Sequence, residues 1–354
     1  MNIANNTVNK INNTLNNTLN IFKSKNNTTN GSRMIIILFL ILVFIMIGYF
    51  SSYSYRVGAT YNELNKYNNI LYIDYNYLNN KDVKNRPLKD FSIATSFRPY
   101  LCKYQMFDYV SDRLVRKTLM SGARCLFIDI FNSSFGKNAE PVVSSGYEKG
   151  NWKLTLNTLS FDKLCQTIAE TAFTSGYVNN YNDPLILLLN LKTNRNYFSI
   201  EKIQKSLFKY FKDRLLGSKY SYQKTDMSNV PINQLMGKVL IFTSGGYENT
   251  SLEELINFSW DKDNINKISY KSLSSNLEDL YNSIKLNIND VRETNKNNLT
   301  LVVPNEDAFF TNNYNTDKFF ISKCQMIAMN YQYFDDNMKK YIQKFKTSSF
   351  ILNQ

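Results

Sequence analysis

Residues 184–191 read PLILLLNL, an apolar run with a proline at its start and a single polar side chain near its end. Such a run is typical of a strand that is buried on both faces, as the strands of parallel sheets are. Similar β-rich apolar runs occur on either side of it, at 91–96, 125–131, 141–144 and 237–242. Between them, residue patterns with helical spacing predict helices over 106–120, 161–173 and 200–216. Strands that alternate with helices in this way predict a parallel sheet with helices outside it.

The N-terminal part of the chain has a different composition. Residues 34–50, MIIILFLILVFIMIGYF, carry no charge, and at about 1.5 Å per residue a helix of that length reaches roughly 26 Å. With 51–53 it crosses a bilayer core of about 30 Å, so we predict a transmembrane helix over 34–53. Residues 1–33 are mostly Asn and Thr and are predicted to be disordered. The polar residues 54–87 are expected to form a stalk.

Composition sets only weak limits on location and partners. The net charge of +13 favours phosphate-rich surfaces such as anionic lipid or nucleic acid. Heavy use of Asn, Lys, Ile and Tyr is typical of an AT-rich genome, such as that of a large DNA virus or a protist. The cysteines are far apart in sequence, without the spacing of a disulfide framework, and they favour a reducing compartment. Basic residues flank the apolar segment on both sides, so the orientation of this predicted single-pass membrane protein stays open.

The motifs of the remaining chain, taken together, resemble one known family. The first five are SIATSFRPYL at 92–101, GARCLFIDIFN at 122–132, EPVVSSGYE at 140–148, PLILLLNL at 184–191 and LMGKVLIF at 235–242. In sequence, order and spacing they resemble the X half of a phosphoinositide-specific phospholipase C. Near the C-terminus, three further segments are similar to the Y half of the same family: TLVVPNEDAFFTNNYN at 300–315, KCQMIAMNYQ at 323–332 and the final SFILNQ.

This resemblance implies an α/β fold, a TIM-type (β/α)8 barrel like that of the PLC-like phosphodiesterases. Sites in such barrels lie at the carboxyl ends of the strands. The barrel is expected over 88–354, with an X-like half at 88–244 and a Y-like half at 298–354.

The resemblance also identifies the positions at which the family has catalytic and calcium-binding residues. In the first motif, Phe97 stands where the family has a catalytic histidine, and Arg98 stands where it has a metal-binding asparagine. In the second motif, Phe127 replaces a calcium-binding glutamate. The family's aspartate two residues later is kept as Asp129.

The other family positions are changed as well. Ser145 stands in place of the second catalytic histidine, and Asn190 in place of the last calcium-binding glutamate. In the Y half, Leu301 and Val303 replace the arginine and tyrosine that hold the phosphorylated inositol. We therefore predict no catalytic residue, no calcium site and no other cofactor.

The composition of the chain supports the same prediction, because it contains no histidine. Phosphodiester cleavage in this family needs a base, an acid and a divalent cation. The chain is therefore predicted to be a membrane-anchored, catalytically inactive relative that acts as a scaffold or interaction module for an unidentified protein partner. The alternative is an active phosphatidylinositol phospholipase C, or a related lipid phosphodiesterase, with an unrecognised site.

Two local features leave alternatives open. Arg98 and Asp129 are expected to pair, either as a structural ion pair, which we favour, or within an anion-binding pocket. Four lysines share one face of a predicted helix, which is either a solvated surface or a basic face for anionic lipid: Lys202, Lys205, Lys209 and Lys212. The aromatic residues of 331–345 are expected to pack in the core, so nucleic acid is not an expected partner.

Overall fold

The computed structural model describes residues 12–14, 16–17, 30–221, 224–261, 266–273, 288–306, 309 and 312–353. The chain divides into two compact units, Met1–Ser54 and Tyr55–Gln354. Most of the segment predicted to be disordered, 1–33, lies outside the described residues.

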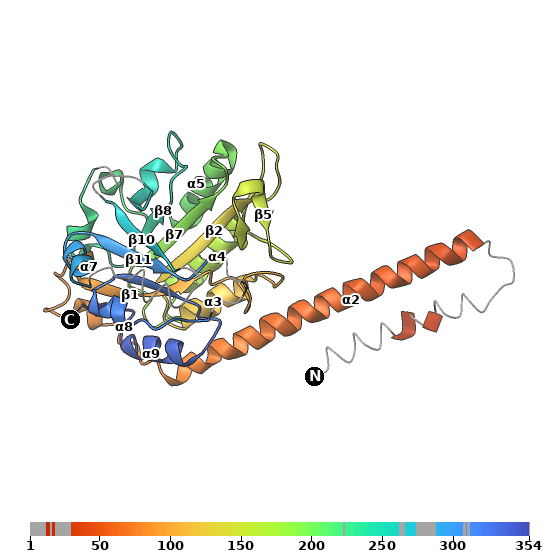
Figure 1. Ribbon diagram of the computed structural model, residues 1–354, viewed down its shortest axis with the longest axis horizontal. Helices are drawn as coiled ribbons and strands as arrows, with labels where there is room; N and C mark the ends of the chain where they lie inside the picture. Colours follow the sequence, from red (N-terminus) through yellow and green to blue (C-terminus); the bar gives the residue numbers. More distant parts are fainter. Residues whose placement is uncertain are drawn as a thin grey trace. The chain divides into compact units, whose positions relative to one another are not determined.

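Within the described residues of the second unit, eight parallel strands form a barrel (Figure 1): β1 (Phe91–Phe97), β2 (Cys125–Asn132), β7 (Leu185–Lys192), β8 (Val239–Thr243), β9 (Ile256–Ser259), β10 (Ile268–Ser272), β11 (Leu299–Val303) and β12 (Met326–Met329). They pair in the order β10, β11, β12, β1, β2, β7, β8, β9. A parallel bridge between Ser259 and Lys267 links β9 to the start of β10, so the barrel is nearly closed. The predicted TIM-type fold is confirmed.

Helices follow the strands along the chain and lie around the sheet (Figure 1): α3 (Asp112–Met120), α4 (Phe161–Ala172), α5 (Tyr197–Phe211), α7 (Ile288–Thr294), α8 (Asp317–Ile321) and α9 (Asp336–Lys344). Ser160 caps α4, since its side chain accepts a hydrogen bond from the backbone N–H of Lys163. The helix predicted over 106–120 begins only at residue 112, because Ser111 caps α3 and Phe107 has a left-handed φ of 54°. Asn196 caps α5, which therefore begins before the predicted residue 200.

Shorter elements complete the second unit. The sheet continues from β2 into the antiparallel strands β3 (Pro141–Val143) and β6 (Leu159–Ser160), and β4 (Gly146–Tyr147) pairs with β5 (Trp152–Lys153). The last strand, β13 (Phe350–Leu352), lies antiparallel to β1 at the amino end of the barrel. Short 3-10 helices are η1 (Lys66–Asn69), η2 (Tyr77–Asn79), η3 (Leu88–Asp90), η4 (Lys149–Asn151), η5 (Ser218–Tyr220), η6 (Met227–Asn229), η7 (Ile232–Gln234) and η8 (Glu253–Leu255).

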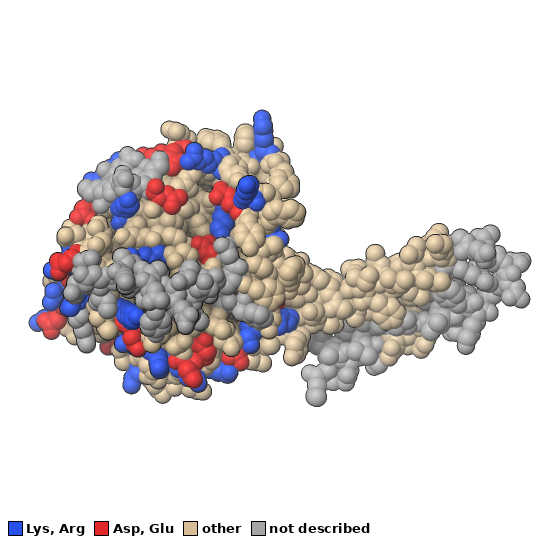
Figure 2. Space-filling model, viewed as in Figure 1, with Lys and Arg blue, Asp and Glu red and all other residues tan. Residues whose placement is uncertain are grey.

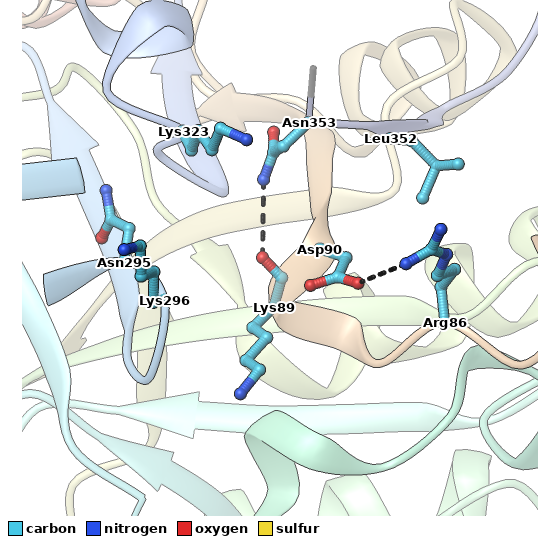
Figure 3. Close-up of a pocket in the computed structure, with 8 residues that line it drawn as sticks. All are labelled: Arg86, Lys89, Asp90, Asn295, Lys296, Lys323, Leu352 and Asn353. Atoms are coloured by element: carbon cyan, nitrogen blue, oxygen red, sulfur yellow. Dashed lines mark hydrogen bonds and ion pairs between the residues drawn. The ribbon is translucent and has the colours of Figure 1, made fainter. Parts of the chain in front are cut away.

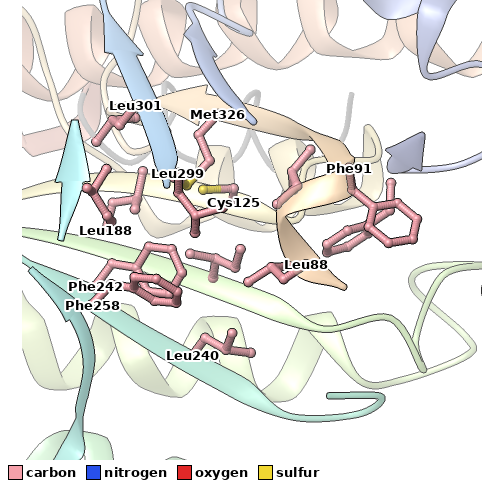
Figure 4. Packing of buried hydrophobic residues seen from close by; sticks show 14 of the residues in the cluster. Leu88, Phe91, Cys125, Leu188, Leu240, Phe242, Phe258, Leu299, Leu301 and Met326 are labelled. Carbon is pink, nitrogen blue, oxygen red and sulfur yellow. The ribbon is translucent and has the colours of Figure 1, made fainter. Parts of the chain in front are cut away.

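Apolar side chains from the strands fill the interior of the barrel (Figure 4). Leu188, Phe242 and Leu301 come from three different strands and are completely buried. All four cysteines are free and buried, as the sequence predicted. Burial raises the pKa of Cys102 and of Cys324 to about 12, so neither thiol ionises near neutral pH.

Residues 55–87, expected to form a polar stalk, belong to the second unit. Val57 and Leu64 are buried, and the ring of Tyr67 stacks on Tyr331 with centroids 5.3 Å apart. The Tyr67 hydroxyl also donates to the Tyr331 carbonyl over 2.8 Å. Apolar and aromatic residues that are scattered along this polar segment thus pack it against the barrel. Because they do not form a continuous apolar run, the sequence did not predict this packing.

Helix α2 (Asn30–Asn65) contains the predicted transmembrane segment, and it is long and apolar enough to cross a membrane. Most large apolar side chains of residues 34–50 are exposed, with Phe44 at 60% and Ile45 at 66%. Figure 2 shows the described part of this segment without a charged side chain, whereas Lys, Arg, Asp and Glu are interspersed on the visible barrel surface. By length and composition, α2 is a candidate membrane span.

The basic face predicted on α5 is partly neutralised. Lys202 Nζ lies 2.5 Å from Glu140 Oε1, and Lys209 Nζ lies 3.1 Å from Asp162 Oδ2. Lys212 lies just beyond the last helical residue, Phe211. These ion pairs reduce the net positive charge of this face.

Candidate functional site

The carboxyl ends of three neighbouring strands bring together predicted site residues. β2 pairs with β1 on one side and with β7 on the other. Arg98 directly follows β1, Asp129 belongs to β2, and Asn190 of β7 is the direct neighbour of Asp129 in the register. The parallel sheet therefore places Arg98, Asp129 and Asn190 at one end of the barrel.

Arg98 and Asp129 form a completely buried ion pair. Arg98 Nη2 lies 2.6 Å from Asp129 Oδ2, and neither side chain is exposed to solvent. Asn190 Nδ2 donates to the other carboxylate oxygen, Asp129 Oδ1, over 2.8 Å. The pairing expected from the sequence is present, and a neutral amide fixes the carboxylate from its second side.

Two further charged residues complete this site. Lys192, the last residue of β7, places Nζ 3.2 Å from Asp129 Oδ2 and 3.0 Å from Glu306 Oε2. Glu306 follows β11, and its Oε2 also lies 3.4 Å from Arg98 Nη2. Two cations and two carboxylates thus form one charge-balanced cluster, which we call the ion network: Arg98, Lys192, Asp129 and Glu306.

Uncharged groups hold the ion network in place. The Tyr270 hydroxyl of β10 donates to Glu306 Oε1, and the Gln105 side-chain oxygen accepts from Arg98 Nη1. The same Nη1 donates to the Glu306 carbonyl over 3.3 Å. Arg98 is therefore held by two side-chain carboxylates, one amide and one backbone group, which restricts the guanidinium to one position.

The backbone of Arg98 is strained. Its φ is 43°, in the left-handed region that residues other than glycine rarely adopt. Such a conformation costs on the order of 1 kcal/mol or more. The contacts of the buried guanidinium offset this cost and hold the backbone of Arg98 in this conformation.

Electrostatics keep the buried pair charged. Burial by itself would raise the pKa of Asp129, but the charges of Arg98 and Lys192 and the hydrogen bond from Asn190 outweigh it, and the pKa lies below its usual value. Burial would lower the pKa of Arg98, yet Asp129 and Glu306 raise it above its usual value. Burial, the charge of Glu306 and the hydrogen bond to it raise the pKa of the Tyr270 hydroxyl. At neutral pH, Asp129 is ionised and Tyr270 keeps its proton.

A row of stacked aromatic rings lies next to the ion network. The Phe97 and Phe127 rings stack with centroids 5.1 Å apart, and Phe127 and Trp260 with centroids 6.3 Å apart. Trp260 stacks in turn on Tyr270 at 5.7 Å. The guanidinium of Arg98 lies 4.6 Å from the centre of the Phe97 ring. The two phenylalanines that the sequence placed at polar family positions thus fill the strand ends with apolar surface.

The remaining predicted positions do not point into an open site. Ser145 is almost completely buried, and its Oγ donates to the Gln105 carbonyl. Leu301 and Val303 belong to the buried core of the barrel. None of these three side chains offers an activated nucleophile or a charged group for a phosphate.

The described residues at this end of the barrel do not fit a calcium ion. Calcium takes about six to eight oxygen ligands in proteins. Asp129 and Glu306 supply carboxylates, but both are already paired with Arg98 and Lys192, whose positive charges would repel a further cation. In the part of the chain that the structure describes, no group of three or more His, Cys, Asp or Glu side chains could hold a metal ion.

Sequence reasoning missed Lys192, Glu306 and Tyr270. Lys192 follows the apolar run of β7 directly, and residues that follow buried parallel strands lie at the same end as Asp129. The position of Lys192 in the sequence could therefore have predicted its place in the site. Glu306 lies in a turn after β11, and Tyr270 lies in a strand without an apolar run, so the sequence pattern predicted neither.

Comparisons with known proteins identify the family and agree with the barrel fold. The X domain of phosphatidylinositol-specific phospholipase C matches residues 84–244, and the Y domain matches 250–352. The 1-phosphatidylinositol 4,5-bisphosphate phosphodiesterase delta-3-A of Danio rerio is 24% identical, with 78% of this chain and 38% of that protein covered. The crystal structures of PLC21 from L. pealei and from S. officinalis each give a TM-score of 0.62 at 20% identity, with 77% of this chain covered and 38% and 37% of theirs. The chain thus spans less than half the length of these relatives.

Proposed function

The chain belongs to the phosphatidylinositol-specific phospholipase C family, and we propose that it is a catalytically inactive member that acts as a membrane-anchored scaffold or interaction module. The ion network is the observation that carries this proposal, because Arg98 and Lys192 hold both carboxylates of the site. The stacked pair of Phe97 and Phe127 supports it, because no proton can be exchanged by either side chain.

The chemistry of the site supports the same proposal. A phosphodiesterase needs one group that accepts a proton from the nucleophile and another that donates one to the leaving group. Histidine is absent from the sequence, Asp129 is held ionised by Arg98, and Tyr270 already donates its proton to Glu306. Loss of a single acid or base costs roughly 10² to 10⁴ in rate, and among the described residues of this site we identify no group free for either role.

The direct test is hydrolysis of phosphatidylinositol 4,5-bisphosphate by the full-length protein in vesicles, with calcium present. We expect release of inositol phosphate at the rate of protein-free vesicles, while an active member of the family hydrolyses the same vesicles. The alternative function, an active lipid phosphodiesterase, predicts release that disappears in the Asp129→Asn variant. That result would refute the proposal.

A second feature favours action at a lipid surface. The segments that follow β1, β2, β7 and β11 along the chain, including β5 and the first turn of α5, carry exposed aromatic side chains, which we call the aromatic rim: Phe107, Phe135, Trp152, Tyr197, Phe198 and Phe309. Phe135, Phe107 and Trp152 are 85%, 68% and 62% exposed. Several exposed aromatic rings are unfavourable in water, whereas aromatic side chains are enriched at membrane interfaces. We propose that the aromatic rim rests on the bilayer.

The position of Trp152 makes the rim testable. The chain has two tryptophans, and the other, Trp260, is only 8% exposed within the aromatic stack. In vesicles that contain brominated lipid, we expect quenching of the fluorescence of the full-length protein, and we expect the Trp152→Phe variant to lose most of it. Equal quenching of the two proteins, or none, would contradict contact of the rim with lipid.

We also propose that α2 anchors the protein as a single span over 34–53, with the barrel in a reducing compartment. Free, buried cysteines support this compartment. Protease digestion of sealed vesicles from the expressing cell tests the orientation. Cleavage within the barrel from the cytoplasmic side is the expected result, and protection until the vesicles are opened would place the barrel on the other side.

A further inference from the structure

We propose that a cavity at the amino end of the barrel is a binding site for a small, multiply charged phosphate compound, such as a phosphate ester or a short polyphosphate. The cavity has a volume of about 310 Å³ (Figure 3). Its walls come from the segments that precede three parallel strands, with Lys89 before β1, Lys296 before β11 and Lys323 before β12. The ion network lies at the opposite, carboxyl ends of the strands, so this cavity is distinct from that site.

The charge of the lining selects an anion. Four cations, Arg86, Lys89, Lys296 and Lys323, face the cavity with one carboxylate, that of Asp90. The pairing of Arg86 with Asp90 is loose, at 3.8 Å between largely exposed side chains. Such a lining leaves excess positive charge within a small volume.

Two of these cations are available to a ligand. Lys296 pairs with Glu293 at 2.7 Å on the exposed surface. In contrast, neither Lys89 nor Lys323 makes an ion pair within the residues that the structure describes, and both are half-buried. An ammonium group that has lost part of its hydration and has no carboxylate partner is a favourable contact for phosphate oxygens.

The backbone at Lys323 strengthens this interpretation. Lys323 has a φ of 59° and follows the C-cap Ser322 of α8. The Lys323 N–H donates to the Phe320 carbonyl and the Cys324 N–H to the Phe319 carbonyl, both over 2.9 Å, which is the Schellman pattern of a helix end. Glycine or asparagine usually occupies this left-handed position. A lysine there is unfavourable for the helix end, and its side chain extends toward Asn353 in the cavity (Figure 3).

Fixed amides shape the rest of the cavity. Asn295 is buried and donates from Nδ2 to the Ser322 carbonyl over 2.7 Å. Asn353 accepts from Ser92 Oγ over 2.6 Å and donates to the Lys89 carbonyl over 3.4 Å. The volume is at the lower end of the range of small-molecule sites, about 300 to 1,000 Å³. It admits a small phosphorylated molecule and excludes a folded protein or a nucleic-acid duplex.

Calorimetric titration of the full-length protein with inorganic pyrophosphate tests this site, in uncharged detergent at low salt and without divalent cations. We expect saturable binding with one site per chain, weakened at least about tenfold by the pair of substitutions Lys89→Gln and Lys323→Gly. Raised salt should weaken binding as well, since the contacts are ionic. Glycine suits the left-handed backbone at 323, so the variant removes the charge without disturbing the helix end.

The control variant is Lys205→Gln, which removes one exposed lysine from α5 and leaves the cavity unchanged. It should bind pyrophosphate like the unmodified protein. A lipid source of the phosphate is distinguished by repeating the titration in nanodiscs with and without phosphatidic acid: competition indicates a headgroup, and unchanged affinity indicates a soluble compound. No binding at millimolar pyrophosphate, or equal binding by the double variant, would overturn the proposal.

Discussion

Each end of the barrel has a basic residue with a left-handed backbone, but the two residues differ in burial and in ion pairing. At the carboxyl end, Arg98 has a φ of 43°, is completely buried and is paired with Asp129 and Glu306. At the amino end, Lys323 has a φ of 59°, is half-buried, and makes no ion pair among the described residues. The strain at Arg98 is offset by internal contacts. At Lys323 the backbone makes the hydrogen bonds of a helix end, but the side chain has no ion pair among the described residues, and we expect a ligand there.

This difference distinguishes a charged side chain that is paired within the fold from one that can bind a ligand. A buried ion pair contributes little net stability compared with apolar side chains of similar size, but removal of one partner leaves an uncompensated buried charge. A partly exposed cation without a partner can be removed at little cost. Substitutions of these two basic residues should therefore change the free energy of unfolding by different amounts and in opposite directions.

The largest effect is expected for Arg98→Met. This substitution leaves Asp129 buried with only Lys192 as its cation, so we expect a loss of about 3 to 5 kcal/mol in the free energy of unfolding. The double variant Arg98→Met, Asp129→Leu removes both charges and should recover most of that loss. Chemical unfolding of the full-length protein in detergent measures both variants. If the double variant is as unstable as the single one, the loss of stability does not come from the unpaired charge of Asp129, and the prediction is wrong.

A smaller effect is expected from acid. The pKa of Asp129 is lower in the folded protein than in the unfolded chain, where it is about 3.9. Its ionic contribution to stability is therefore complete above that value and is lost as the pH falls through the lowered pKa. Asp129→Asn should flatten the acid side of the stability profile, whereas Lys323→Gly should leave it unchanged. Parallel profiles for Asp129→Asn and the unmodified protein would contradict the assignment.

The smallest effect on stability is expected for Lys323→Gly. Glycine adopts the left-handed conformation without strain, so the free energy of unfolding should stay the same or rise by up to about 1 kcal/mol. Thermal unfolding of the variant beside Lys323→Ala is the measurement. Alanine keeps the strain and should be the less stable of the two. A marked loss of stability in the glycine variant would mean that Lys323 stabilises the fold and is not held for a ligand.

Much of the barrel could be predicted from the sequence. The strands β1, β2, β7 and β8 are long apolar runs that are buried in the structure, and burial on both faces is what makes such runs recognisable. The strands β9 and β10, INFS and ISYKS, are short and partly polar, and no strand was predicted there. The Y-like half was accordingly placed from 298, although the Y-domain match begins at 250.

The site was only partly predictable. Arg98 and Asp129 could be paired in advance because the family resemblance places both at metal-binding positions, and the structure joins them. Glu306 could not, because it reaches the ion network from a turn whose conformation no local pattern specifies. The packing of Tyr67 on Tyr331 was also unpredictable, since it joins residues 264 positions apart.

Calcium binding tests the central claim, that the ion network closes the carboxyl end of the barrel to a metal. A ligand that binds the folded state raises its stability, by about 2.7 kcal/mol at a concentration one hundred times its dissociation constant. We therefore measure thermal unfolding of the full-length protein across a calcium titration into the millimolar range, beside an equal titration with magnesium. The ion network predicts no saturable calcium-specific rise in melting temperature. A saturable rise with calcium that is abolished in Asp129→Asn would show that the cations give way to the metal, and would contradict the account.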